Sequence, residues 1–306
     1  MKSKQFLQKM MVGLSLILML GTSCKKEETP AAQTIADIVN SNGDFSILKA
    51  AVEKSGIGST LSSGTLTVFA PDNAAFAAAG ITESTLQSLT AAQVANILTY
   101  HVLGLRVSSA EVPASDAVGS LQGQKIFASR NANGVFVNGI KVKAADIQAS
   151  NGIIHVIENV LIPPTQTIQQ IAAGNPNLSL LVAAVSKAGL LNAIGADGKL
   201  TVFAPTNAAF NAAGFNTAAD IEAASTSLIN TVVSYHVIGT NVFASDLING
   251  ATAPTLQGGT LTIGLNPPSV KITSSSNPAS NIILEGGVNI VATNGVVHLI
   301  NRVLLP

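Results

Sequence analysis

Apolar residues near the start of the chain recur at helical spacing. Across residues 45–54, the side chains of Phe45, Leu48 and Val52 fall on one face. This spacing is typical of an amphipathic helix that packs on a core. A further helix is expected over about Thr90–Thr99.

A short continuous apolar run follows the first helix. Leu66–Phe69 is rich in apolar and β-branched residues, which predicts a buried strand. Pro71 sets its end, because proline has no N–H to donate to a sheet. Asp72 is the expected N-cap of a short alanine-rich helix that begins there.

Strands and turns are expected after these helices. Val135–Val137 and Ile140–Val142 flank Asn138-Gly139, a pair that favours a tight hairpin. Another strand is expected over Ile153–Ile157. Helices concentrated early and strands late predict an α+β fold.

The whole pattern occurs twice. Three segments have close counterparts: Leu66–Pro71 at Leu200–Pro205, Asn73–Phe76 at Asn207–Phe210, and Asn151–Ile157 at Asn294–Ile300. The offset grows from 133 residues (Thr34 to Thr167) to 143 (Asn151 to Asn294), which is too long for a solenoid repeat. The chain is therefore expected to hold two duplicated domains, over residues 34–164 and 165–306, joined at the stiff pair Pro163-Pro164.

The first 23 residues predict a secretory signal peptide. Lys2, Lys4 and Lys9 precede the apolar run Met10–Gly21. That run is about 12 residues long, whereas a membrane-spanning helix needs roughly 20. We therefore expect a signal core and no mature membrane span.

Cys24 is the only cysteine, so the chain cannot form an internal disulfide. Its position after Leu20–Ser23 resembles the lipobox of bacterial lipoproteins, although Gly21 stands where a larger aliphatic residue is usual. The resemblance implies acylation of Cys24, a tether over residues 24–33 and an outer-membrane lipoprotein, either surface-exposed or facing the periplasm. The alternative is a chance cysteine beside an ordinary cleavage site.

Composition and charge narrow the function classes. Apolar residues make up 47% of the chain and charged residues 10%, so each half can bury a sizeable core. Without the three lysines of the first 23 residues, 16 − 3 = 13 basic groups face 16 acidic ones. A net charge near −3 gives no electrostatic reason to bind nucleic acid.

Neither catalysis nor a metal site is indicated by the motifs. The chain has no nucleophile elbow, phosphate loop or dinucleotide fingerprint. The four histidines and two tyrosines fall at equivalent places in the two halves: His101 and His236, His155 and His298, Tyr100 and Tyr235. Metal ligation is one explanation, but the two histidines of each half are more than fifty residues apart, so hydrogen-bonded core positions are favoured. No catalytic residue, metal or cofactor is assigned.

Three ordered segments in each half resemble a fasciclin domain. They are Thr67–Phe76, Tyr100-His101 and Asn151–Val160 in the first half, and Thr201–Phe210, Tyr235-His236 and Asn294–Val303 in the second. The resemblance implies two tandem fasciclin-like domains, each a wedge or sandwich of β-strands with several α-helices packed on it. It also implies an extracellular setting and adhesion to cells or matrix without catalysis.

The family's adhesive activity implies candidate residues in this chain. These are the Tyr-His pairs Tyr100-His101 and Tyr235-His236, and the pair Asp146-Ile147. In the second half, Asn289-Ile290 takes the place of Asp146-Ile147, so a role that needs the carboxylate can exist only in the first. The Tyr-His pairs also have a purely structural explanation.

Three hypotheses about the function follow. The first is an adhesion or binding lipoprotein whose partner is extracellular matrix, a cell-surface protein or a glycan, with self-association as a further option. The alternative is a glycan-binding accessory lipoprotein of a nutrient-uptake system. The chain has no tryptophan and two tyrosines, which disfavours a sugar-stacking surface. A periplasm-facing structural lipoprotein is a third option.

Overall fold

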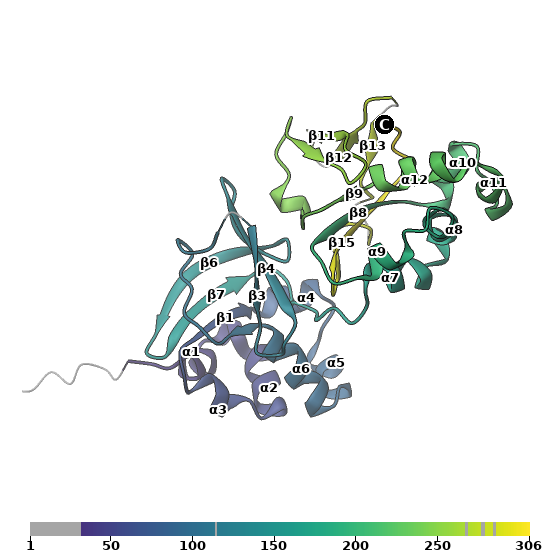
Figure 1. Ribbon diagram of the computed structural model, residues 1–306. Helices are drawn as coiled ribbons and strands as arrows, with labels where there is room; N and C mark the ends of the chain where they lie inside the picture. The colour runs from purple at the N-terminus through teal and green to yellow at the C-terminus, as the bar shows by residue number, and fades with distance from the viewer. Residues whose placement is uncertain (1–31, 114, 267–268, 277–278, 284–285) are drawn as a thin grey trace, which may run out of the picture. The chain divides into compact units, whose positions relative to one another are not determined.

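The first copy begins with helices and ends with strands, as the sequence predicts (Figure 1). Its helices are α1 (Ile35–Ser41), η1 (Gly43–Phe45), α2 (Ser46–Ser55), α3 (Gly58–Leu61), α4 (Asn73–Ala78), α5 (Glu83–Ser88) and α6 (Ala91–Tyr100). Its strands are β1 (Leu66–Pro71), β2 (Val102–Leu103), β3 (Ser115–Gly119), β4 (Lys125–Asn131), β5 (Gly134–Val137), β6 (Ile140–Ala149) and β7 (Gly152–Ile157).

This computed structural model describes residues 32–113, 115–266, 269–276, 279–283 and 286–306. The expected signal peptide, Cys24 and the tether up to residue 31 lie outside the described residues. No helix in the described ranges is both long enough and apolar enough to span a bilayer.

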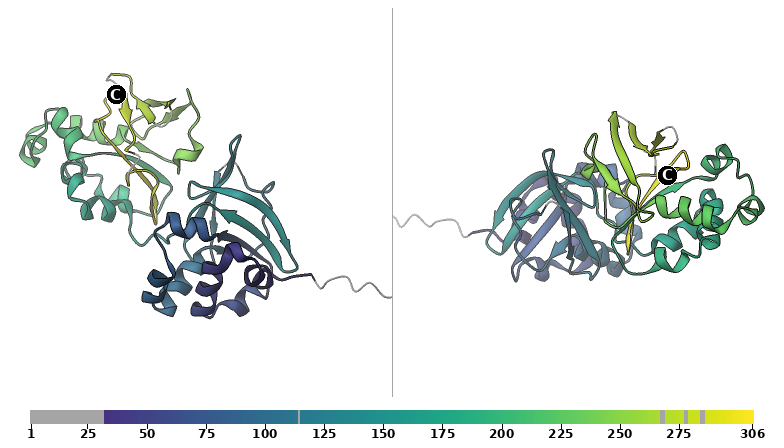
Figure 2. Two further views of the ribbon diagram at one scale, coloured as in Figure 1. Left: turned by 180° about the vertical axis from the view of Figure 1, so that it is seen from behind. Right: turned by 45° about the horizontal axis from the view of Figure 1, so that its top comes forward.

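The strands of the first copy form one seven-stranded sheet in the order β2-β1-β7-β6-β5-β4-β3. β1 and β7 pair in parallel, with Phe69 opposite His155, and the other neighbours pair antiparallel. Figures 1 and 2 show the helices gathered against one side of this sheet. The parallel pair thus joins the first long strand of the copy to its last.

Two apolar cores lie on opposite faces of β1. On the helical side, Val68 packs with Phe45, Leu48 and Leu98 of the helices. On the other side, Phe69 packs within a core built mainly from strands. β1 is buried on both faces, which explains why its sequence is a continuous apolar run without alternation.

Local hydrogen bonds fix where helices start. The Asp72 carboxylate accepts the N–H of Ala75 at 2.9 Å, which confirms Asp72 as the N-cap of α4. Thr90 caps α6 through a reciprocal pair of contacts with Gln93. Pro71 is the last residue of β1, so the strand extends slightly further than its apolar run.

The predicted hairpin is present between β5 and β6. Asn138 and Gly139 both have positive φ, 49° and 77°, as a two-residue turn of this kind requires. β6 runs to Ala149 through register shifts, well beyond the expected end at Val142. The sequence does not predict β3 and β4, because these strands mix polar and apolar residues without a clear period.

The second copy repeats the helical part. Its helices are α7 (Ile168–Gly174), η2 (Pro176–Leu178), α8 (Ser179–Lys187), α9 (Leu191–Gly195), α10 (Asn207–Ala212), α11 (Ala218–Ala223), α12 (Thr226–Tyr235) and η3 (Ala244–Asp246). Its strands are β8 (Leu200–Pro205), β9 (Val237–Ile238), β10 (Thr252–Pro254), β11 (Thr260–Asn266), β12 (Ser269–Thr273), β13 (Ser280–Asn281), β14 (Ile290–Ala292) and β15 (Gly295–Ile300).

The strands of the second copy divide into two four-stranded sheets, β14-β15-β8-β9 and β10-β11-β12-β13. β8 and β15 pair in parallel in the same register as β1 and β7, with Phe203 opposite His298. An isolated antiparallel bridge between Ile282 and Ile300 joins β15 to the residues that follow β13. The α+β class and the tandem repeat of strands and packed helices are confirmed.

Candidate functional site

Tyr100 ends α6 inside the strand-side core. Its side chain is 0% exposed, and its hydroxyl donates to the carbonyl of Lys125 at 2.9 Å. The same hydroxyl accepts from Nδ2 of Asn138 at 2.9 Å. Burial raises the pKa of Tyr100 to about 12, although the Asn138 contact opposes this. The hydroxyl of Tyr100 therefore joins the C-terminal end of α6 to β4 and to the turn between β5 and β6.

His101 follows directly and is 2% exposed. Its Nε2 accepts the N–H of Leu161 at 2.9 Å, so the ring proton lies on Nδ1, which donates to the carbonyl of Ile97 at 2.9 Å. Burial lowers the pKa of His101 to about 4, against a smaller opposing effect of the Ile97 hydrogen bond. The neutral imidazole joins the end of α6 to the segment after β7.

The second copy repeats the bonds that this Tyr-His pair makes to the backbone. The Tyr235 hydroxyl donates to the carbonyl of Thr260 at 2.7 Å. His236 bonds the carbonyl of Val232 through Nδ1 at 2.8 Å and accepts the N–H of Leu304 through Nε2 at 2.9 Å. Burial lowers the pKa of His236 to about 4 as well.

Neither Tyr-His pair presents its side chains to a partner in this fold. All four side chains are at most 2% exposed, and their polar atoms are used within the domain. Loss of attachment after a change at these positions would therefore report a damaged fold. The candidates that remain accessible are those of the first copy's Asp-Ile pair.

Asp146 lies in β6, is half-buried and has a positive φ of 61°. Its carboxylate accepts the N–H of Ser109 at 2.8 Å and also the Ser109 hydroxyl. Its own N–H donates to Nδ1 of His155 at 3.2 Å, and Nε2 of that ring donates to the carbonyl of Val107 at 2.9 Å. Burial raises the pKa of Asp146, but the two Ser109 hydrogen bonds, together with smaller electrostatic effects of His155 and Arg106, hold the pKa below its usual value.

Asn289 holds the same position in the second copy, with φ of 53°. Its N–H donates to Nδ1 of His298 at 3.3 Å, and its Oδ1 accepts the N–H of Ala244 at 2.8 Å. Ala244 stands where the first copy has Ser109, so no hydroxyl is present to need a second acceptor oxygen. Aspartate therefore suits the first copy, where Ser109 donates through both its N–H and its hydroxyl, and asparagine suits the second copy, where Ala244 donates only through its N–H. Both tolerate the left-handed backbone.

Ile147 is half-buried and packs against the helical-side core. The pair Asp146-Ile147 thus combines a hydrogen-bonded carboxylate with an aliphatic side chain that is partly committed to packing. Both keep some exposed surface. They remain the adhesion candidates of the first copy.

His155 and His298 are core residues of the parallel strands. Each ring stacks on the phenylalanine opposite, with centroids 5.6 Å apart for Phe69 and His155 and 5.7 Å for Phe203 and His298. Burial lowers the pKa of both imidazoles. Within the described ranges, no group of three or more His, Cys, Asp or Glu side chains is placed to hold a metal ion.

Other repeated motif residues also serve the fold. Asn151 accepts the N–H of Ile35 at 2.9 Å and donates to the carbonyl of Leu61 at 2.9 Å, so it ties α1 and α3 to the start of β7. Asn294 makes the matching bonds in the second copy. Sequence reasoning did not assign these roles, although the exact repetition of the asparagine was a visible signal.

Comparison with known proteins matches this architecture. The family model described as the fasciclin domain matches residues 43–163 and again 176–306. Transforming growth factor-beta-induced protein ig-h3 of Sus scrofa is 30% identical over 251 residues, which cover 79% of this chain and 35% of that protein. Periostin of Homo sapiens is 30% identical over 250 residues, with 79% and 28% covered. Protein sll1483 of Synechocystis sp. is 42% identical over 139 residues, with 44% and 77% covered.

The chain spans about a third of the length of the first two of these relatives. Among solved structures, a FAS1 domain pair from the insect cell adhesion molecule fasciclin I is similar at a TM-score of 0.43 and 16% identity. That match covers 88% of this chain and 94% of the other.

Proposed function

Since the chain belongs to the fasciclin domain family, with two copies of the domain, we propose that it is a non-catalytic adhesion module of the cell surface or envelope. The observation that carries the proposal is this family membership, which holds for both halves. Two domains in series can also hold a partner more firmly than one, because the second contact forms at a high effective concentration.

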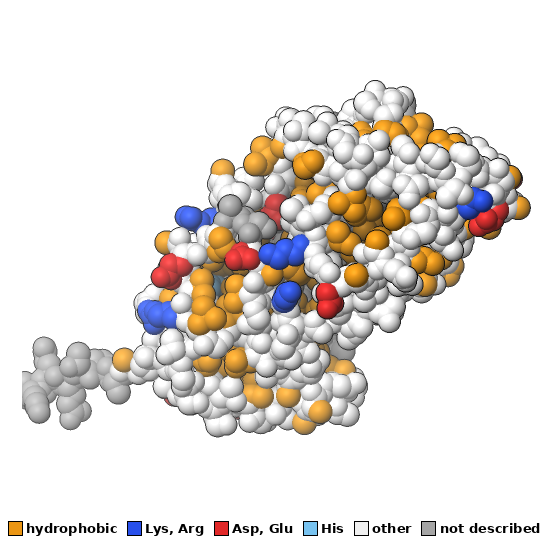
Figure 3. Space-filling view, in the orientation of Figure 1, with side chains coloured by type: hydrophobic (Ala, Val, Ile, Leu, Met, Phe, Trp, Pro, Cys, Tyr) orange, Lys and Arg blue, Asp and Glu red, His pale blue; other side chains and the backbone are white. Residues whose placement is uncertain are grey.

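The character of the surface supports protein contacts over polyelectrolyte binding. Only 10% of residues are charged, and the face shown in Figure 3 carries few Lys, Arg, Asp or Glu side chains among neutral and apolar atoms. Such a surface suits an extracellular matrix protein, a cell-surface protein or a second copy of the chain. It offers little to nucleic acid.

Attachment of beads coated with residues 25–306 to cells or matrix tests adhesion directly. We expect attachment above that of an unrelated lipoprotein ectodomain. Asp146→Asn should weaken it while preserving the fold, because asparagine occupies the equivalent left-handed position at Asn289. The matched control Asn289→Asp should leave attachment unchanged. Wild-type beads that attach no better than the unrelated protein would refute the adhesive role.

The anchor is proposed separately. Acylation of Cys24 would hold the domains at the outer membrane, because acyl chains contribute about 0.8 kcal/mol per buried methylene. Cys24→Ser should release the protein from the membrane fraction. Protease treatment of intact cells should cleave a surface-exposed protein and spare a periplasm-facing one. A strong glycan-array signal without cell attachment would favour the glycan-uptake alternative.

A further inference from the structure

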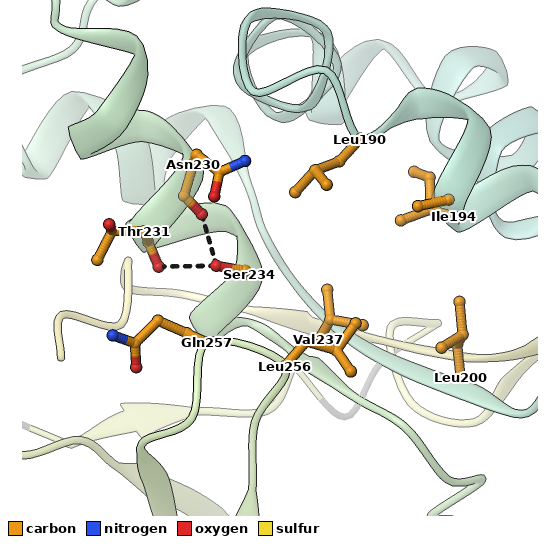
Figure 4. Close-up of a pocket in the computed structure, with 10 residues that line it drawn as sticks. Leu190, Ile194, Leu200, Asn230, Thr231, Ser234, Val237, Leu256 and Gln257 are labelled. Atoms are coloured by element: carbon orange, nitrogen blue, oxygen red, sulfur yellow. Dashed lines mark hydrogen bonds between the residues drawn. The ribbon is translucent and has the colours of Figure 1, made fainter.

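The second copy contains a pocket whose lining includes neither a Tyr-His pair nor the counterpart of the Asp146-Ile147 pair. It has a volume of about 420 Å³ and opens between α9, the last turns of α12 and the turn after β10. Figure 4 shows aliphatic side chains on one side of it and polar side chains on the other. Its volume lies within the range of small-molecule sites, roughly 300–1,000 Å³.

The aliphatic side is formed by Leu190, Ile194, Leu200, Val237 and Leu256. Leu256 is 57% exposed, and Leu190 and Leu200 are half-buried. These side chains thus keep apolar surface in contact with water. A bound aliphatic group would remove that surface from water at about 25 cal/mol per Å².

The polar side is formed by α12 and the following turn. Nδ2 of Asn230 donates to the carbonyl of Ala188 at 3.0 Å, which orients the amide and leaves Oδ1 as an acceptor. The Ser234 hydroxyl donates to the carbonyl of Asn230 at 2.6 Å, so its oxygen can still accept. The dashed lines of Figure 4 mark this back-bonding. The pocket edge therefore offers acceptors to a ligand that can donate.

The corresponding place in the first copy is bridged. There, Nε2 of Gln122 donates to Oδ1 of Asn96 at 3.0 Å, which links the turn to α6 across the groove. The second copy keeps the glutamine as Gln257, but Thr231 replaces the asparagine four residues before the tyrosine. Threonine is too short to make this bridge. In the second copy, the pocket is therefore open between α12 and the turn that carries Gln257.

The exposure of the aliphatic side chains beside the pocket also differs between the two copies. In the first copy, Leu121, the counterpart of Leu256, is also 43% exposed, but Ile57 is 9% exposed and Leu66 is 5% exposed, so this part of the aliphatic wall is covered. Their counterparts Leu190 and Leu200 are half-buried. The duplicated domains therefore differ at this site, whereas the histidines of both Tyr-His pairs keep the same backbone hydrogen bonds.

We propose that the second copy binds a small uncharged aliphatic compound that carries a hydrogen-bond donor such as a hydroxyl. None of the ten described residues that line the pocket is charged, so an ionised ligand would lose its hydration without gaining a partner of opposite charge. None of these ten is aromatic either, which leaves no flat face for a sugar ring. This binding does not depend on the adhesive role, and it can be tested in solution.

1-Octanol and octanoate at pH 7.5 are matched probes, since they differ mainly in head-group charge. Binding to residues 25–306 is followed by methyl NMR and titration calorimetry. We expect saturable 1:1 binding of 1-octanol that shifts the methyl signals of Leu190, Ile194 and Leu200. Octanoate should bind at least tenfold more weakly. No saturable binding of 1-octanol, or equal binding of octanoate, would overturn the proposal.

Two variants at equivalent helix positions provide the control. Thr231→Asn should rebuild the bridge to Gln257 and weaken 1-octanol binding at least fivefold. Asn96→Thr, the reciprocal change in the first copy, should leave binding at the second copy unchanged. Thermal unfolding checks that both variants fold, and Ala193→Leu gives a second way to fill the pocket. Unchanged binding in both Thr231→Asn and Ala193→Leu would refute the site, as would equal loss in Asn96→Thr.

Discussion

Replacing His236 by glutamine tests whether a buried neutral imidazole makes the fold sensitive to mild acid. Burial lowers the pKa of His236 to about 4, whereas an exposed imidazole titrates near 6.5. The unfolded chain therefore binds a proton more tightly than the folded chain does. The stability contributed by the neutral ring is complete above pH 6.5 and is lost as the pH falls from 6.5 towards 4.

The size of this loss follows from the two pKa values. At pH 5.0 the unfolded imidazole is mostly protonated and the folded one is mostly neutral. The free energy of unfolding should therefore fall by about 2 kcal/mol between pH 7.5 and 5.0 for each of His101 and His236, since one pKa unit corresponds to about 1.4 kcal/mol. Carboxylates contribute little here, because they titrate mainly below pH 5.

Urea unfolding of residues 25–306 at pH 7.5 and 5.0 measures the effect. Glutamine keeps a donor and an acceptor but does not titrate, so His236→Gln should remove about 2 kcal/mol of the pH-dependent loss from the second copy. His101→Gln is the matched variant and should act on the first copy. Wild-type stability that is equal at the two pH values would refute the reasoning. So would a folded His236→Gln protein that keeps the full pH dependence.

Three further changes test the hydrogen bonds and the packing. Asp146→Ala should lower the stability of the first copy by about 1–3 kcal/mol more than Asp146→Asn in urea unfolding, because it leaves the Ser109 N–H without its acceptor; equal effects would contradict this. Gly152→Ala should abolish folding of the first copy, as judged by circular dichroism and hydrogen exchange, because a Cβ would lie 2.0 Å from the Leu66 carbonyl oxygen. Asn241→Val should raise the stability of the second copy by about 1 kcal/mol in thermal unfolding, because both polar side-chain atoms of Asn241 are buried without a partner in the described chain. A lower midpoint would argue against this last assignment.

Local features were the ones that the sequence could predict. The N-cap at Asp72 and the hairpin at Asn138-Gly139 depend on neighbouring residues, and both are present. The parallel pairing of β1 and β7 joins segments about 80 residues apart, and no local pattern encodes it. The candidate site also depends on long-range contacts that the sequence does not predict, because the hydrogen-bond partners of Tyr100 and His101 come from distant segments.

The pocket was beyond sequence reasoning for another reason. It depends on exchanges of single residues at equivalent helix positions, such as Asn96 for Thr231 and Ala95 for Asn230. Such a change alters no periodicity and no motif. The role of Asn96 becomes clear only from the structure, in which its side chain accepts a hydrogen bond from Gln122.

The identity of β1 and β8 has a consequence for how the chain reaches its native state. Both strands have the sequence Leu-Thr-Val-Phe-Ala-Pro, and each pairs in parallel with a similar partner, β7 or β15. During synthesis β7 is made before β8, so β1 meets its own partner first. In refolding from denaturant all four strands compete at once, and we expect exchange of partners between chains to yield intertwined dimers. The fraction of such dimers should therefore rise with protein concentration during refolding and stay low in freshly translated protein.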